Sequence, residues 1–137
     1  MKKARFELET LSRDNFVQNA QNNGCDVTYH TLEDDEEFLD ALTQKIVEEL
    51  EQVFDADTKE QAIEELADLD EILITFKALV GIDQKDIDAA RLKKLATEGG
   101  FEQRIYAESI DTPVNSKEYG YYAQLSEKYE SVTNDDE

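Results

Sequence analysis

Two stretches in the middle of the chain repeat apolar residues at helical spacing, and they predict two amphipathic helices joined by a short turn. A helix turns by about 100° per residue, so residues three and four apart share a face. The first stretch ends near Ala56, and its apolar stripe consists of Leu39, Leu42, Ile46, Leu50 and Val53. The second has a broader apolar arc, which consists of Leu66, Leu69, Ile72, Leu73, Phe76 and Val80.

Residues that favour helix ends flank both stretches. The acidic run at 33–37 precedes the first stretch, and negative charge suits a helix N-terminus because of the helix dipole. Thr58 and Gln61 have the spacing of a capping box at the start of the second stretch. Gly81 then ends the second helix, as glycine commonly does.

Three carboxylates fall on or beside the apolar faces of these two helices. On the helical wheel Glu49 lies on the shoulder of the first stripe, Glu65 inside the second arc, and Asp68 at the edge of that arc. Glu48 and Glu51 point nearly opposite the first stripe, toward water. The wheel therefore predicts that Glu49, Glu65 and Asp68 face the interior.

Carboxylates that face an apolar interior are costly to ionise unless a cation accompanies them. A divalent metal is the simplest such cation, and hard oxygen ligands select Mg²⁺, Mn²⁺ or Ca²⁺. The alternative is a set of plain salt bridges to Lys or Arg, since 35% of the residues are charged. The pattern alone leaves both interpretations open.

A third helix is expected over Gln84–Glu98, with Asp83 as its cap and Gly99 at its end. Arg91 and Lys94 share the face of Ile87 on this helix. Cations on such a face are what a phosphate site requires.

The remaining segments predict smaller elements. Asp14 is placed to cap a short helix over residues 15–22. Apolar and polar residues alternate over 26–32, and 101–109 has similar strand character, so we expect a small two-stranded β addition to a helical body. We expect one domain over residues 1–110, followed by an aromatic C-terminal segment and acidic tail over 111–137.

Charge and composition exclude several classes of partner. The formal net charge is -20, from 34 acidic and 14 basic residues, so nucleic acid polymers and anionic membranes would be repelled.

A lone cysteine, Cys25, excludes an intramolecular disulfide and fits a reducing cytosol. We see no signal peptide and no apolar run long enough to span a bilayer, so we expect a cytoplasmic protein.

Four motifs follow one another along the chain: KIVEELEQV, EELADLDEI, ARLKK and GGFEQRIY. In this order they resemble the all-α NTP pyrophosphatase superfamily, which includes MazG-like proteins and phosphoribosyl-ATP pyrophosphohydrolases. The small house-cleaning pyrophosphohydrolases of this superfamily are the most similar branch. They typically begin with a V-R-D-K segment, here residues 12–15, and end with a Tyr-Tyr…Lys-Tyr segment, here residues 121–129.

The resemblance implies a helical bundle completed by a second subunit, and Mg²⁺-dependent cleavage of a nucleoside triphosphate to its monophosphate and pyrophosphate. The family's metal motif is ExxE followed by ExxD, and Glu65 and Asp68 match its second half. For the first half, Glu48 with Glu51 fits the letters. Glu49 with Gln52 fits the helix face and the family's usual register, and we favour that pair.

The family's chemistry assigns expected roles to further residues. We expect metal ligands at Glu49, Gln52, Glu65 and Asp68, with Mg²⁺ or Mn²⁺ as the ion. Glu49 would orient or deprotonate the attacking water, and Lys45 would neutralise developing charge. The cations and the acid expected to contact the substrate are Arg13, Asp14, Arg91, Lys94 and Arg104.

Three departures from the family pattern support other functions. Gln52 stands where the family has a carboxylate, Asn15 replaces the usual Lys, and Glu98 stands where an Arg usually precedes the two glycines. These changes favour, as one alternative, a weakened or inactive member that binds nucleotide or metal without turnover. A second alternative is an acidic structural dimer that binds a protein partner.

Overall fold

The computed structural model describes residues 2–125 and residue 128. In this part of the chain all regular secondary structure is helical, which confirms the all-α prediction. The helices are α1 (Phe16–Asn22), α2 (Asp35–Asp55), α3 (Lys59–Val80), α4 (Gln84–Glu98) and α5 (Lys117–Gln124). Within the described residues no helix is both long and apolar enough to cross a bilayer.

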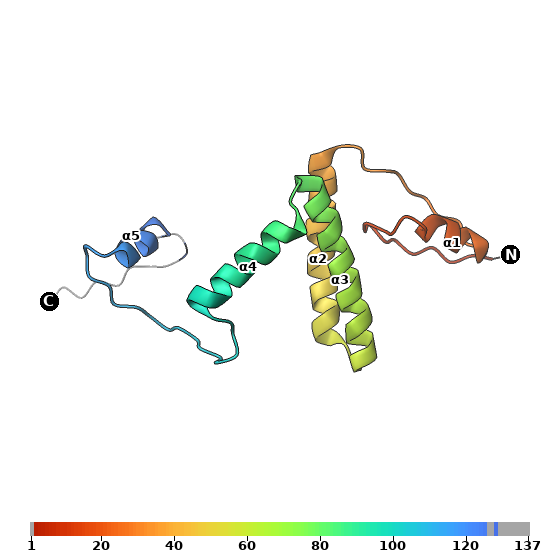
Figure 1. The fold of residues 1–137 in the computed structure, drawn as a ribbon. Coiled ribbons are helices and arrows are strands. Elements are labelled where there is room, and N and C mark those ends of the chain that lie inside the picture. The colour runs from red at the N-terminus through yellow and green to blue at the C-terminus, as the bar shows by residue number, and fades with distance from the viewer. Residues whose placement is uncertain (1, 126–127, 129–137) are drawn as a thin grey trace. The chain divides into compact units, whose positions relative to one another are not determined.

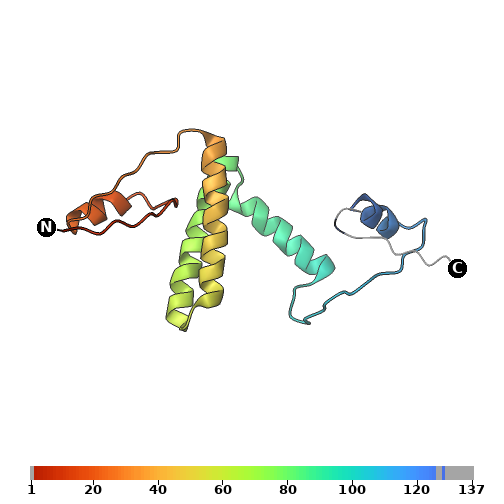
Figure 2. The ribbon, with the colours of Figure 1, turned by 180° about the vertical axis from the view of Figure 1, so that it is seen from behind.

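Helices α2 and α3 form an antiparallel pair that lies side by side in both views (Figures 1 and 2). The N-termini of both helices are capped by side chains, Asp34 for α2 and Thr58 for α3. The Asp34 carboxylate accepts from the Glu37 N–H at 3.2 Å, and the Thr58 hydroxyl accepts from the Gln61 N–H at 3.1 Å. These caps satisfy backbone donors that the helices themselves leave unpaired.

The turn between α2 and α3 and the end of α3 also follow from local sequence. The Gln61 side-chain oxygen accepts a hydrogen bond from the Asp57 N–H at 3.1 Å, so Gln61 stabilises the turn through its side chain as well as its backbone. Gly81 ends α3 with a φ of 73°, a left-handed conformation that only glycine adopts without a steric penalty. The predicted boundaries of α2, α3 and α4 are therefore confirmed to within one or two residues.

The core of the pair is small and lies between the two predicted apolar faces. Leu42 on α2 is 1% exposed and Ile72 on α3 is 9% exposed. Leu69 and Phe76 are half-buried beside them. Outside this core, apolar side chains on both helices stay open to solvent, including Phe54 at 83%.

The start of α1 differs from the prediction. Asn15, rather than Asp14, is the N-cap residue, and it makes no side-chain cap hydrogen bond. The Phe16 N–H instead donates to the Arg13 carbonyl at 3.0 Å, so a backbone turn replaces the expected side-chain cap. The helix ends as expected before Gly24, which has a φ of 81°.

The predicted two-stranded β addition is wrong for the described residues, because neither 26–32 nor 101–109 forms a strand. Alternating side chains favour a strand only when a neighbouring strand pairs its backbone groups. The two segments also fall in different compact units of the chain, residues 1–96 and 97–137. Tyr29 and Tyr106 are 62% and 90% exposed, so the aromatic side chains of the two segments stay largely in solvent.

The second unit contains one described helix, α5, whose start is capped by Ser116. The Ser116 hydroxyl accepts from the Tyr119 N–H at 3.2 Å. The rings of Tyr121 and Tyr122 meet edge to face at 5.0 Å, which is a favourable geometry for two aromatic rings. The acidic tail and Tyr129 lie outside the described residues.

Candidate metal centre

Helices α2 and α3 bring together the three carboxylates that the helical wheel places inward. Each of Glu49, Glu65 and Asp68 offers one carboxylate oxygen, and these oxygens all lie within 4.8 Å of one another. Glu65 and Asp68 are three residues apart on α3, so they share a face, and Glu49 meets them from α2. We call these three residues the carboxylate triad.

Burial distinguishes the triad from an ordinary acidic surface. Glu49 is only 4% exposed, and Glu65 and Asp68 are half-buried. One oxygen of Glu49 and one of Glu65, Oε2 in each case, are shielded from solvent and have no hydrogen-bond partner in the described chain. Buried acceptors normally have partners, so two that lack them at one place indicate that a cation or a proton belongs there.

The pKa of the Glu49 carboxyl is raised above its usual value. Burial is the largest cause, followed by the hydrogen bond that its protonated form makes with Glu65 and by the negative charge of Asp68. The Lys45 ammonium opposes the shift but does not cancel it. The charges of the triad are thus only partly compensated by the chain's own cations.

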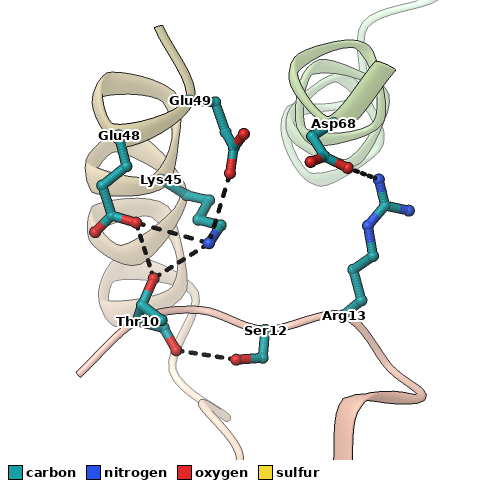
Figure 3. Close-up of polar contacts among 7 residues, drawn as sticks. All are labelled: Thr10, Ser12, Arg13, Lys45, Glu48, Glu49 and Asp68. Atoms are coloured by element: carbon teal, nitrogen blue, oxygen red, sulfur yellow. Dashed lines mark hydrogen bonds and ion pairs between the residues drawn. The ribbon is translucent and has the colours of Figure 1, made fainter. Parts of the chain in front are cut away.

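Lys45 lies one helical turn before Glu49 and faces the same site (Figure 3). Its Nζ atom is 3.7 Å from Glu49 Oε1 and 3.6 Å from Glu48 Oε2. The side chain is 24% exposed, so it reaches the site from a partly desolvated position. This placement agrees with the role expected of Lys45 beside a phosphate, a role that remains a proposal.

A third element contributes to the site: the N-terminal strap, residues 10–13, which passes from α2 to α3 (Figure 3). The Thr10 hydroxyl donates to Glu48 Oε2 at 2.9 Å and accepts from Lys45 Nζ at 3.3 Å. At the other end of the strap, Arg13 Nη2 donates to Asp68 Oδ1 at 2.5 Å. Arg13 therefore contacts the triad through Asp68, one of its two members on α3.

Gln52, the fourth ligand expected from the sequence, shares a cavity with one residue of the triad. It is exposed and lines a cavity of about 290 Å³ that the triad residue Glu65 also lines. The other lining residues are Glu48, Glu51, Asp55 and Gln61. Of the two pairs that the sequence left open, the pair Glu49 and Gln52 contains the residue that completes the cluster, Glu49.

The structure corrects the expectation that Glu48 simply faces water. Glu48 is half-buried, contacts Lys45 and Thr10, and lines the cavity. The wheel describes one isolated helix, so it missed the N-terminal strap that covers this side of α2. No sequence signal distinguished Thr10 from its neighbours.

No hydrogen bond or ion pair within the described chain joins Asp14, Arg91 or Lys94 to a triad residue. Asp14 is exposed next to Arg13. Arg91 and Lys94 are exposed on α4, and neither forms an ion pair with a triad residue in the described chain. Arg104 belongs to the second unit and has a left-handed φ of 59°. Their expected roles remain predictions.

The residues present fit a divalent cation. Three carboxylates supply hard oxygen ligands, and two buried oxygens lack any other partner within the described chain. Comparisons with family models, with curated proteins and with solved structures found no match.

Proposed function

We propose that this chain is a Mg²⁺- or Mn²⁺-dependent nucleoside triphosphate pyrophosphohydrolase that clears non-canonical nucleotides. The observation that carries the proposal is the unpartnered, shielded Oε2 of Glu49, 4% exposed, in a cluster with Glu65 and Asp68. Folding a carboxylate into such a position is unfavourable without a cation. The resemblance of the motifs to NTP pyrophosphatases supplies the class of reaction.

Each residue of the site has a task in the proposed reaction. Glu49, Glu65 and Asp68 would hold the cation, which would supply positive charge against the phosphate and lower the pKa of the attacking water. Water oxygen forms a bond to the α-phosphorus, the bond from that phosphorus to the bridging oxygen breaks, and pyrophosphate leaves. Glu49 accepts the proton of the water, because it is the carboxylate of the site that approaches from α2 and is the most deeply buried of the three.

Lys45 stabilises the charge that moves onto the leaving pyrophosphate. Its ammonium is held near the triad by contacts with Glu48, Glu49 and the Thr10 hydroxyl. A partly desolvated ammonium interacts more strongly with phosphate than one in bulk water. Gln52 on the cavity wall offers a neutral oxygen in place of a carboxylate, so the proposed site binds its cation more weakly than a four-carboxylate site.

We further propose that a second copy of the chain covers the exposed apolar side chains of the α2–α3 pair. Val47, Leu50 and Phe54 recur along α2 at spacings of three and four, and all are exposed. Ile63 and Leu66 have the same spacing on α3 and are 56% and 46% exposed. Two amphipathic helices seldom bury a broad apolar face alone, and pairing with another two gives a four-helix bundle.

Pyrophosphate release from a panel of canonical and modified nucleoside triphosphates, in Mg²⁺ and in Mn²⁺, tests the proposed reaction. We expect release with one or more substrates, and loss of release in Glu65→Gln and Asp68→Asn. Glu64→Gln is the matched control, because Glu64 precedes Glu65 and is exposed. Full activity in the Glu65 and Asp68 variants contradicts the site, and cation binding without any release supports the binding-only alternative.

A further inference from the structure

We propose that the N-terminal strap is a built-in competitor for the carboxylate triad, and that a divalent cation displaces Arg13 from Asp68 when it binds. The proposal rests on the proposed cation site, and it concerns how the chain regulates access to that site. The strap reaches the triad from outside the α2–α3 pair and contacts both helices (Figure 3).

The contact that blocks the site is the ion pair between Arg13 and Asp68. Arg13 Nη2 is 2.5 Å from Asp68 Oδ1, and Asp68 is one of the three residues that form the triad. A guanidinium and a divalent cation that share one carboxylate repel each other at close range. The cation therefore has to displace the guanidinium or bind with lower affinity beside it.

The two ends of the strap are held by different contacts. Thr10 contacts α2 through two hydrogen bonds, one to Glu48 and one from Lys45. Arg13 contacts α3 through an ion pair with Asp68, between side chains that are 63% and 40% exposed. Exposed ion pairs contribute little stability, so a divalent cation at the triad can displace the Arg13 guanidinium at small cost.

The backbone before the strap agrees with a segment under constraint. Glu9, immediately before Thr10, has a φ of 44°, which is an uncommon conformation for a residue with a side chain. Thr10 and Arg13 make the hydrogen bonds and the ion pair that join residues 10–13 to the helices, and Leu11 between them is half-buried.

Mn²⁺ binding to the full chain, measured by the electron paramagnetic resonance signal of free Mn²⁺, is the first test. We expect Arg13→Gln to bind Mn²⁺ about two- to fivefold more tightly than the unchanged chain, the factor that corresponds to one exposed ion pair. Lys3→Gln is the matched control, because Lys3 carries the same charge and forms a similar exposed ion pair with Asp26, at 2.7 Å. The control corrects for the loss of one positive charge.

Trypsin cleavage after Arg13 is the second test, because it reports displacement of the strap directly. We expect Mn²⁺ to speed cleavage after Arg13 relative to cleavage after Arg5, an exposed residue in the same segment. Arg13→Lys keeps a cleavage site and tests whether the guanidinium itself gives the protection.

The outcomes separate this proposal from the proposed function. An Mn²⁺ affinity of Arg13→Gln that equals or falls below that of Lys3→Gln overturns the competition, as does a cleavage ratio that Mn²⁺ leaves unchanged. If Mn²⁺ binds to none of the variants, the cation site fails and the competition fails with it. Tighter binding together with faster cleavage supports displacement of Arg13.

Discussion

Glu49 on α2 and Glu65 on α3 each have one carboxylate oxygen, Oε2, that is buried from solvent. Neither oxygen has a hydrogen-bond partner in the described chain. Two acceptors cannot satisfy each other unless a proton or a cation lies between them. Without a metal ion, protonated Glu49 makes a hydrogen bond with Glu65, and this bond helps to raise the pKa of Glu49. The triad can thus exchange a proton for a metal ion.

The raised pKa of Glu49 predicts how the stability of the metal-free protein depends on pH. In the unfolded chain the carboxyl titrates near its usual value of 4.5, and in the folded chain it titrates higher. The folded state therefore binds more protons between these two values, so the free energy of unfolding falls as pH rises from 4.5 through the folded pKa. Above the pKa of Glu49 in the folded chain, the free energy of unfolding falls no further on account of this group.

Glu49→Gln isolates this contribution because glutamine has the same shape and no charge to titrate. We expect its free energy of unfolding, measured by urea denaturation in EDTA, to exceed that of the unchanged chain increasingly as pH rises. At low pH the two should converge. Glu51→Gln is the control, since Glu51 is exposed, and an equal effect there contradicts the prediction.

Gln52→Glu should strengthen cation binding. The substitution adds a carboxylate to the wall of the cavity that Glu65 also lines, where it attracts a divalent ion without entering the buried cluster. We expect a gain in Mg²⁺ affinity of about tenfold, the equivalent of about 1.4 kcal/mol, measured by calorimetry. Gln44→Glu adds the same charge at an exposed position on α2, and an equal gain there would assign the effect to net charge.

Thr58→Ala should destabilise the α2–α3 pair. The Thr58 hydroxyl accepts from the Gln61 N–H at 3.1 Å, and alanine leaves that donor without its cap. The expected loss in the free energy of unfolding is about 1 kcal/mol, measured by urea denaturation. Thr58→Ser retains the hydroxyl and should keep most of the stability; an equal loss in both variants would exclude the cap as the cause.

Phe54→Ser together with Ile63→Ser should weaken self-association. Both side chains belong to the exposed apolar surface of α2 and α3 and contribute little to the core of one chain. Sedimentation velocity should show a dimer for the unchanged chain and a shift toward monomer for the double variant. Ile105→Ser, in the second unit and 81% exposed in the unchanged chain, serves as the control. A monomer at all concentrations for the unchanged chain contradicts the proposed bundle.

The sequence predicted the site to the extent that it depends on single helices. Glu49, Glu65 and Asp68 could be identified because helical periodicity fixes which side chains share a face with apolar residues. The same reasoning missed Glu48 and Thr10, whose contacts depend on a segment that crosses from outside the helix pair. It also predicted strands at 26–32 and 101–109, where pairing depends on a partner rather than on local alternation.

The sequence by itself determined helices α2, α3 and α4, where these three begin and end, and the inward side of α2 and α3. These features depend on residues close together in the sequence, such as the Thr58 cap, the left-handed Gly81 and the spacing of apolar residues. They can therefore be predicted from the sequence. Only the tertiary structure decided that Glu49 meets Glu65 and Asp68, and that Arg13 pairs with Asp68 over 55 positions of sequence. Such contacts arise from packing between distant segments, and no local pattern encodes the distance between them.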